Sequence, residues 1–214
     1  MARKASKGAC RLCNLVLSGT GMSKHLQSCI PKHIEGLQKT KGLKAGSFFH
    51  LMVQGAHAPE YWLHLKISSE AKLKALDKFL REIWLECCGH FSAFRYFNRE
   101  LGMQRRLLDI LNPGMQFIHE YDFGDTTVLS IKVLGHYEGL TKGKAQIEIL
   151  ARNDPPEILC EECGKAPAVE ICTQCQWDGK GWLCASCAEE HQCDDEMRLP
   201  VVNSPRTGVC GYSG

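Results

Sequence analysis

Four pairs of cysteines, each with two residues between its members, recur along this chain: Cys10 and Cys13, Cys160 and Cys163, Cys172 and Cys175, Cys184 and Cys187. A C-x2-C pair forms a turn in which both thiolates reach one tetrahedral zinc ion. The total of thirteen cysteines is odd and does not suit disulfides alone. The first residues, MARKASKGAC, lack the apolar run of a secretory signal. We therefore expect zinc rather than disulfides, in a cytoplasmic protein.

The first pair belongs to a zinc-finger pattern. A histidine follows it after eleven residues, and a further cysteine comes four residues later. Residues four apart share one face of a helix, so these two side chains can close a tetrahedral shell with the first two. Met22 and Leu26 are expected to form the small core, and the metal to supply most of the folding free energy. The predicted ligands are Cys10, Cys13, His25 and Cys29.

The other three pairs lie close together near the C-terminus, followed by His191 and Cys193. Eight ligands fit two tetrahedral zinc ions, and the pattern resembles cross-brace modules such as the B-box. The resemblance implies that the first and third pairs share one ion, and that the second pair shares the other with the last two ligands. The implied sets are Cys160, Cys163, Cys184 and Cys187, and Cys172, Cys175, His191 and Cys193.

Two alternatives remain open for this module. Cys210 can replace Cys193 as the last ligand, although a helix that ends near His191 and a turn at Cys193 favour Cys193. An iron–sulfur cluster also uses cysteine ligands. With the finger, the preferred interpretation gives three zinc ions per chain.

Charge is distributed unevenly along the chain. Residues 1–44 contain nine Lys and Arg but one acidic residue, whereas residues 153–214 contain four basic and eleven acidic residues. Phosphates are attracted to the first segment and repelled by the second. Any nucleic acid is therefore expected to bind weakly to residues 1–44, unless these lysines belong only to a solvated linker. The candidate contacts are Lys24, Lys32, Lys39 and Lys41.

Composition divides the chain into a finger at 8–30, a basic linker at 31–44, a mixed domain at 45–152 and a cysteine-rich module at 157–214. In the mixed domain, residues 61–67 alternate as in a strand, whereas apolar residues of 73–84 recur at helical spacing. Further strands are predicted at 116–121 and around Leu129 to Val133. Strands and helices do not alternate strictly, so the fold class is α+β. No apolar run is long enough for a membrane span.

The mixed domain resembles a known family. The strand from Trp62 to Ile67, the helix after it, the stretch from Gly89 to Phe94, and above all Tyr121–Asp125 are similar to the plasmid Ri open-reading-frame-three-like family. This family occurs in bacterial and archaeal proteins, including proteins carried by plasmids and insertion sequences. The resemblance covers residues 48–150 and implies an α+β fold, but it implies no particular reaction.

The sequence favours a non-enzymatic zinc adaptor that binds a protein partner through its C-terminal module, or nucleic acid through its N-terminal segment. The alternative is a metal-dependent hydrolase or nuclease that uses carboxylate and imidazole groups. Its candidate residues are His119, Glu120, Asp122, Asp125 and His136. Neighbouring residues of a strand point to opposite faces, which argues against their convergence. Cys87 and Cys88 are interpreted as core thiols, with a Cys87–His90 nucleophile pair as the alternative.

Overall fold

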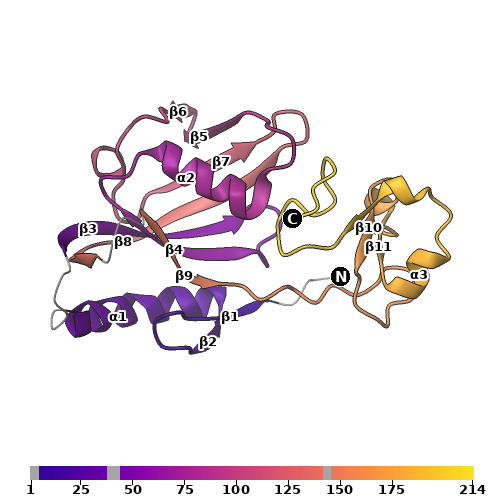
Figure 1. Cartoon of the computed structure of the whole chain (residues 1–214), viewed down its shortest axis with the longest axis horizontal. Coiled ribbons are helices and arrows are strands. Elements are labelled where there is room, and N and C mark those ends of the chain that lie inside the picture. Colours follow the sequence, from indigo (N-terminus) through magenta and orange to yellow (C-terminus); the bar gives the residue numbers. More distant parts are fainter. Residues whose placement is uncertain (1–4, 38–43, 142–145) are drawn as a thin grey trace.

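A seven-stranded antiparallel sheet lies at the centre of the chain, with α1 on one face and α2 on the other (Figure 1). The computed structural model describes residues 5–37, 44–141 and 146–214. The order of strands in the sheet is β6-β5-β7-β8-β3-β4-β9. The strands are β3 (Lys44–Gly55), β4 (Trp62–Ser68), β5 (Ser92–Tyr96), β6 (Arg99–Leu101), β7 (Gln116–Tyr121), β8 (Thr127–Thr141) and β9 (Ile147–Arg152). The predicted α+β class is confirmed.

The two faces of the sheet contact different helices. α2 (Leu73–Leu80) continues as a π-helical turn to Leu85, and its apolar face packs on a large hydrophobic core with Phe49 and Leu63. The neighbouring residues Phe48 and Trp62 point the other way, into the cluster beneath α1. The strand predicted at 116–121 and the helix predicted at 73–84 are confirmed. A short 3₁₀ turn at Leu107–Asp109 precedes β7.

The finger packs directly against this sheet. β1 (Lys7–Ala9) and β2 (Val16–Ser18) form an antiparallel hairpin, and α1 (Gly19–Leu37) follows it. Met22 and Leu26 are fully buried, as predicted. Their cluster includes side chains of the sheet, namely Phe48, Trp62, Leu150 and Ala151. The finger is therefore one layer of the central fold rather than a separate unit.

Helix α1 extends beyond the predicted end of the finger. The sequence predicts a linker over 31–44, but residues 31–37 are the last part of α1. Pro31 has no N–H to bond the carbonyl of Gln27, and Gln27 is exposed to water. Ile34 continues the apolar face of the helix against the sheet. This burial favours the helical path across Pro31.

The cysteine-rich module is a small unit with its own sheet, beside the central domain. It contains the three-stranded sheet β11-β10-β12 and the short helix α3 (Ala185–Glu189). Its strands are β10 (Glu170–Cys172), β11 (Trp182–Leu183) and β12 (Arg198–Pro200), with 3₁₀ turns at Gln176–Asp178 and Asp195–Met197.

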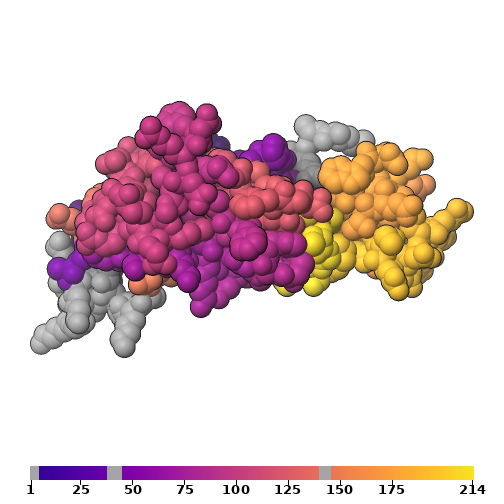
Figure 2. All heavy atoms as spheres, turned by 90° about the horizontal axis from the view of Figure 1, so that it is seen from above, coloured from indigo at the N-terminus to yellow at the C-terminus, as the bar shows by residue number. Residues whose placement is uncertain are grey.

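The last residues of the chain return to the central domain. Asn203 bonds to Asn153, and Ser204 Oγ donates to the carbonyl of Trp84 over 2.6 Å. Figure 2 shows this tail between the central domain and the rest of the module. The cysteine-rich module predicted at 157–214 therefore ends near Val201, and the tail after it packs on the central sheet and α2. No helix within the described ranges is long and apolar enough to cross a bilayer.

Two buried histidines lie on the face of the sheet that α1 covers. His50 on β3 and His64 on β4 are fully buried, and His50 Nε2 lies 2.9 Å from His64 Nδ1. Burial lowers the pKa of His50 to about 3, with a further contribution from His64. Burial also lowers the pKa of His64 to about 4. Both side chains are therefore neutral in the folded protein at neutral pH.

This pair makes stability sensitive to acid. The unfolded chain takes up a proton at His50 below about pH 6.5, whereas the folded chain does so near pH 3, so acidification favours unfolding between these values. In denaturant titrations, wild type should lose about 2 kcal/mol more unfolding free energy from pH 7 to pH 5 than His50→Gln. Acid would also release any metal held by the cysteines in both proteins. The difference between the two pH dependences, rather than either one alone, therefore tests the histidine pair.

The matched control is His57→Gln, at an exposed position. Its pH dependence should follow that of wild type. Equal slopes for wild type and His50→Gln would contradict the assignment of acid sensitivity to the buried pair.

Candidate metal centres

The four predicted ligands of the finger come together at one point. Cys10 and Cys13 lie between β1 and β2, where Asn14 adopts a left-handed φ of 63° that closes the turn. His25 and Cys29 lie one helical turn apart on α1. Cys13 Sγ is 3.2 Å from His25 Nε2, and Cys10 Sγ is 4.0 Å from Cys29 Sγ. These separations suit ligands around one tetrahedral zinc ion, which lie about 3.5–3.8 Å apart.

The module contains two further clusters, in the cross-brace arrangement that the resemblance to B-box modules implies. Cys163 Sγ is 3.8 Å from Cys184 Sγ, and Cys175 Sγ is 3.5 Å from Cys193 Sγ. Within each cluster, all four ligand atoms lie within 4.8 Å of one another. The two sets are Cys160, Cys163, Cys184 and Cys187, and Cys172, Cys175, His191 and Cys193.

The end of α3 explains how two ligands only two residues apart reach one site. α3 ends at Glu189, so His191 and Cys193 lie on non-helical backbone and are not forced onto different helix faces. Cys210 lies elsewhere and does not join this cluster.

Hydrogen bonds favour the thiolate form of two ligands in the module. The hydroxyl of Ser186 lies 3.4 Å from Cys184 Sγ, and with the backbone N–H of Cys187 it lowers the pKa of Cys184 to about 6. Burial opposes ionisation of Cys172, but hydrogen bonds, first that of the Cys175 N–H, lower its pKa to about 7. The thiolate is the form that coordinates a metal, so both cysteines are suited to binding near neutral pH.

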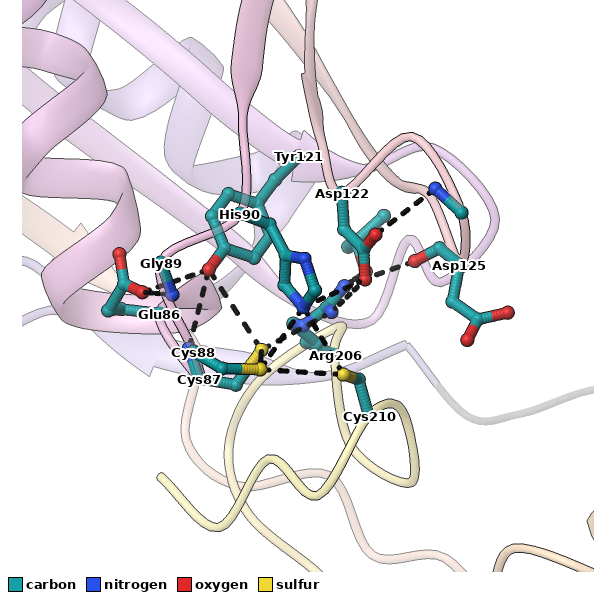
Figure 3. A network of polar contacts seen from close by, with 12 residues as sticks. Glu86, Cys87, Cys88, Gly89, His90, Tyr121, Asp122, Asp125, Arg206 and Cys210 are labelled. Atoms are coloured by element: carbon teal, nitrogen blue, oxygen red, sulfur yellow. Dashed lines mark hydrogen bonds and ion pairs between the residues drawn. The ribbon is translucent and has the colours of Figure 1, made fainter.

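The structure contains a fourth cluster that the sequence analysis missed. Cys87, Cys88 and His90 follow the π-helical turn after α2, and Cys210 comes from the tail (Figure 3). Cys88 Sγ is 3.6 Å from Cys210 Sγ and 3.1 Å from His90 Nε2. The interpretation of Cys87 and Cys88 as core thiols is wrong for Cys88, which is exposed. In the nucleophile-pair alternative, the cysteine nearest His90 is Cys88 rather than Cys87.

Local spacing did not indicate this cluster. Two adjacent cysteines and a nearby histidine do not form a C-x2-C pair, and Cys210 is 120 residues from His90 along the chain. The number of cysteines was the available signal, because the three predicted sites leave Cys87, Cys88 and Cys210 without a role. The four clusters together use all thirteen cysteines of the chain.

The proposed hydrolase residues do not converge. His119 is fully buried on β7 and lies 2.8 Å from Asp77 of α2. The next residue, Glu120, points to the other face and pairs with Arg95 at 2.6 Å. This is the alternation that strand geometry requires.

Of the remaining members of that set, Asp122 and Asp125 share one partner, Arg206, and His136 has another. Asp122 Oδ2 accepts a hydrogen bond from Arg206 at 2.7 Å, and the carbonyl of Asp125 accepts another. His136 Nε2 lies 2.9 Å from Ser69 Oγ on another part of the sheet. In the part of the chain that the structure describes, none of these residues belongs to a group that could hold a metal.

Two of the four candidate phosphate contacts can be located. Lys24 and Lys32 are exposed on α1. Lys39 and Lys41 lie outside the described residues. In a ββα finger, three residues near the helix start contact bases, and the matching positions here are Ser18, Gly21 and Lys24. Ser18 Oγ, just before α1, already accepts the backbone N–H of Gly21 over 3.4 Å.

Comparison with known proteins adds little. No protein-family model matches the chain, and no curated protein matches it. A solved structure of a protein of unknown function, MM3350 from Methanosarcina mazei Go1, overlaps 50% of this chain and 67% of its own, with a TM-score of 0.42 and 14% identity. This likeness is too weak to inform the function.

Loss of a ligand should remove one ion. Cys193→Ser and His191→Ala are each expected to lower the metal content by one ion per chain in elemental analysis, and the double variant by no more than one. The hydrophobic cluster around Cys172 and Leu183 includes the ligands themselves, so loss of the ion should also unfold part of the module. Near-ultraviolet circular dichroism of the tryptophans reports this change.

Gln192→Ser is the matched control, because Gln192 lies between the two ligands and is exposed. It should retain all ions. If Cys193→Ser kept the metal content of wild type, Cys193 would not be a ligand.

Proposed function

We propose that this chain is a zinc-binding interaction protein whose finger and cysteine-rich module fold around structural zinc ions. The observation that supports this most directly is the number of ligands: the finger cluster and both module clusters each contain four Cys or His side chains. Four protein ligands complete a tetrahedral shell and leave no position for substrate. Thiolate-rich sets also select zinc over hard cations such as Mg²⁺. A histidine ligand in two of the three clusters favours zinc over an iron–sulfur cluster, so elemental analysis should find zinc without iron.

The module has surface features of a protein-binding site. Trp177 is 83% exposed at one edge of the module, beside the exposed Asp178. Residues 153–201 carry eleven acidic and three basic side chains. Exposed tryptophans are common anchors of protein interfaces, and an acidic surface is complementary to a basic one. We therefore propose a partner protein with a basic, partly apolar surface.

Recovery of partners from the native host tests this proposal. Full-length wild type and Trp177→Ala serve as baits, with and without nuclease. Trp177→Ala should recover the partner at least about tenfold less well, as expected for loss of an interface anchor. Nuclease should not change recovery by wild type.

Phe97→Ala is the matched control, since Phe97 is equally exposed at 83% but lies on the central domain. It should behave as wild type. Equal recovery by Trp177→Ala, or loss of the partner after nuclease treatment, would contradict binding of a protein by the module.

Weak nucleic-acid binding is a second candidate function. It is supported by the nine Lys and Arg of residues 1–44 and by the exposure of Lys24 and Lys32 on α1. The side chain of Ser18 is already used at the start of α1, which leaves little chemistry for reading bases. We also propose that the central domain belongs to the plasmid Ri open-reading-frame-three-like family, on the motifs described above. The association of that family with mobile elements agrees with contact to nucleic acid by analogy.

Charge reversal in the full chain tests this second function. Deletion of residues 1–44 is unsuitable, because α1 covers one face of the sheet. Lys24→Glu with Lys32→Glu should weaken DNA binding and reduce the slope of log affinity against log salt by about 2, since two phosphate contacts are lost. Fluorescence anisotropy from about 50 to 200 mM salt measures this slope.

Lys165→Glu with Lys180→Glu, in the acidic module, is the matched control and should leave the slope unchanged. An unchanged slope in the α1 variant would show that these lysines do not contact phosphate.

A further inference from the structure

The C-terminal tail is anchored to the central domain without any metal. Asn203 Nδ2 donates to the carbonyl of Asn153 over 2.9 Å, and Asn153 Nδ2 donates to Asn203 Oδ1 over 2.7 Å. Arg152 also donates to the carbonyl of Asn203 over 2.7 Å. The chain thus leaves the central domain and returns to it at the same place.

Arg206 places the tail next to the fourth cluster. Its side chain is fully buried, and its guanidinium bonds to Asp122 Oδ2 at 2.7 Å and to Thr127 Oγ1 at 2.9 Å. The guanidinium also lies over the ring of Tyr121, 4.8 Å from its centre. A buried, multiply bonded arginine fixes the backbone that carries it, and Cys210 follows four residues later. Figure 3 shows Arg206 and Cys210 together against the loop that carries Cys87 and Cys88.

The four ligand atoms have the spacing of a tetrahedral metal site. Cys87 Sγ is 3.5 Å from Cys88 Sγ, and His90 Nε2 is 3.3 Å from Cys210 Sγ. All four atoms lie within 4.8 Å of one another. These values match the separations in the finger and the module, and the cysteines are free thiols rather than disulfides. Cys210 adopts a φ of 50°, a left-handed conformation that non-glycine residues keep only where their surroundings fix it.

The charges around the cluster also suit a bound metal. Three thiolates around a divalent cation leave a net negative charge, which a nearby positive group stabilises. Arg206 supplies it, since its guanidinium lies 3.4 Å from Cys87 Sγ. Residues that contact the ligands in this way orient them and adjust their affinity for the metal.

We propose that Cys87, Cys88, His90 and Cys210 bind a fourth metal ion, which fastens the C-terminal tail to the central domain. Three thiolates and an imidazole select a soft or borderline dication such as Zn²⁺. The ion joins a loop of the central domain to the end of the chain, so it fixes the second attachment of the cysteine-rich module. None of its four ligands is fully buried, whereas each other cluster contains a buried cysteine. This ion is therefore the most accessible to chelators.

Metal analysis of full-length variants tests the site. Cys88→Ser and Cys210→Ser should each lose one ion per chain, and the double variant should lose no more than one, because both residues bind the same ion. A chelator titration of wild type should release one ion before the others, and this first step should be missing in Cys210→Ser. Cys88 is exposed, so its substitution has little effect on the core.

Hydrogen exchange followed by mass spectrometry tests whether the fourth ion fastens the tail to the central domain. In Cys210→Ser, the tail amides of Thr207, Val209 and Tyr212, which bond within the tail, should exchange about tenfold faster or more. The matched control is Cys13→Ser in the finger, which should also lose one ion but leave exchange in the tail unchanged; a module ligand is unsuitable, because Gln176 Nε2 donates to the tail carbonyl of Gly208 over 3.0 Å. This control separates fastening of the tail by the fourth ion from a general effect of metal loss.

Three results would overturn the proposal. One is a wild-type metal content in Cys210→Ser, and another is the loss of two ions in the double variant. The third is unchanged exchange of the tail after the ion is lost, which would leave a metal site without a fastening role.

Discussion

The cysteine-rich module depends on two groups of four Cys and His side chains, each of which could hold a metal ion. One hydrophobic cluster of the module consists of Ile158, Ala168, Ile171 and Trp182, and the other is built around Cys172, Leu183 and Ala188 with further ligands packed against it. Such small clusters bury too little apolar surface to offset the entropy lost on folding. The two Cys and His clusters, each of which could hold a metal ion, therefore take over part of the role of a core. The central sheet, by contrast, has a large core of its own beneath α2.

The finger combines the two modes of stabilisation. Its four Cys and His side chains could hold a metal ion, and Met22 and Leu26 also pack against Phe48 and Trp62 of the sheet. α1 is thus both the ligand-bearing helix of the finger and the cover of one sheet face. This double role constrains what the finger can bind, because the inner side of α1 is covered by the sheet, whereas its outer side, with Lys24 and Lys32, remains open to a partner.

Local patterns predicted the parts of the structure that depend on local geometry. The strand at 116–121 and the helix at 73–84 each bury one face, so periodicity identified them. β3 was missed because both of its faces are covered: Phe48 lies beneath α1 and Phe49 beneath α2, and no alternation of polar and apolar residues remains. The same distinction holds for the metal sites. C-x2-C pairs carry their geometry in their spacing, whereas Cys210 meets Cys88 through long-range contacts that hold the tail, such as that of Arg206 with Asp122.

The mutual hydrogen bonds of Asn153 and Asn203 have a topological consequence. The chain enters and leaves the cysteine-rich module through neighbouring points, so the module is an insertion into the central domain rather than an appendage at its end. A short turn from residue 153 to residue 203 would restore a continuous path and keep the bonds of Arg206 and Ser204 to the central domain, while the tail would lose the hydrogen bond from Gln176 to Gly208. The module is thus an inserted unit whose two ends lie side by side. Insertions of this kind are tolerated, because replacing them leaves the path of the rest of the chain unchanged.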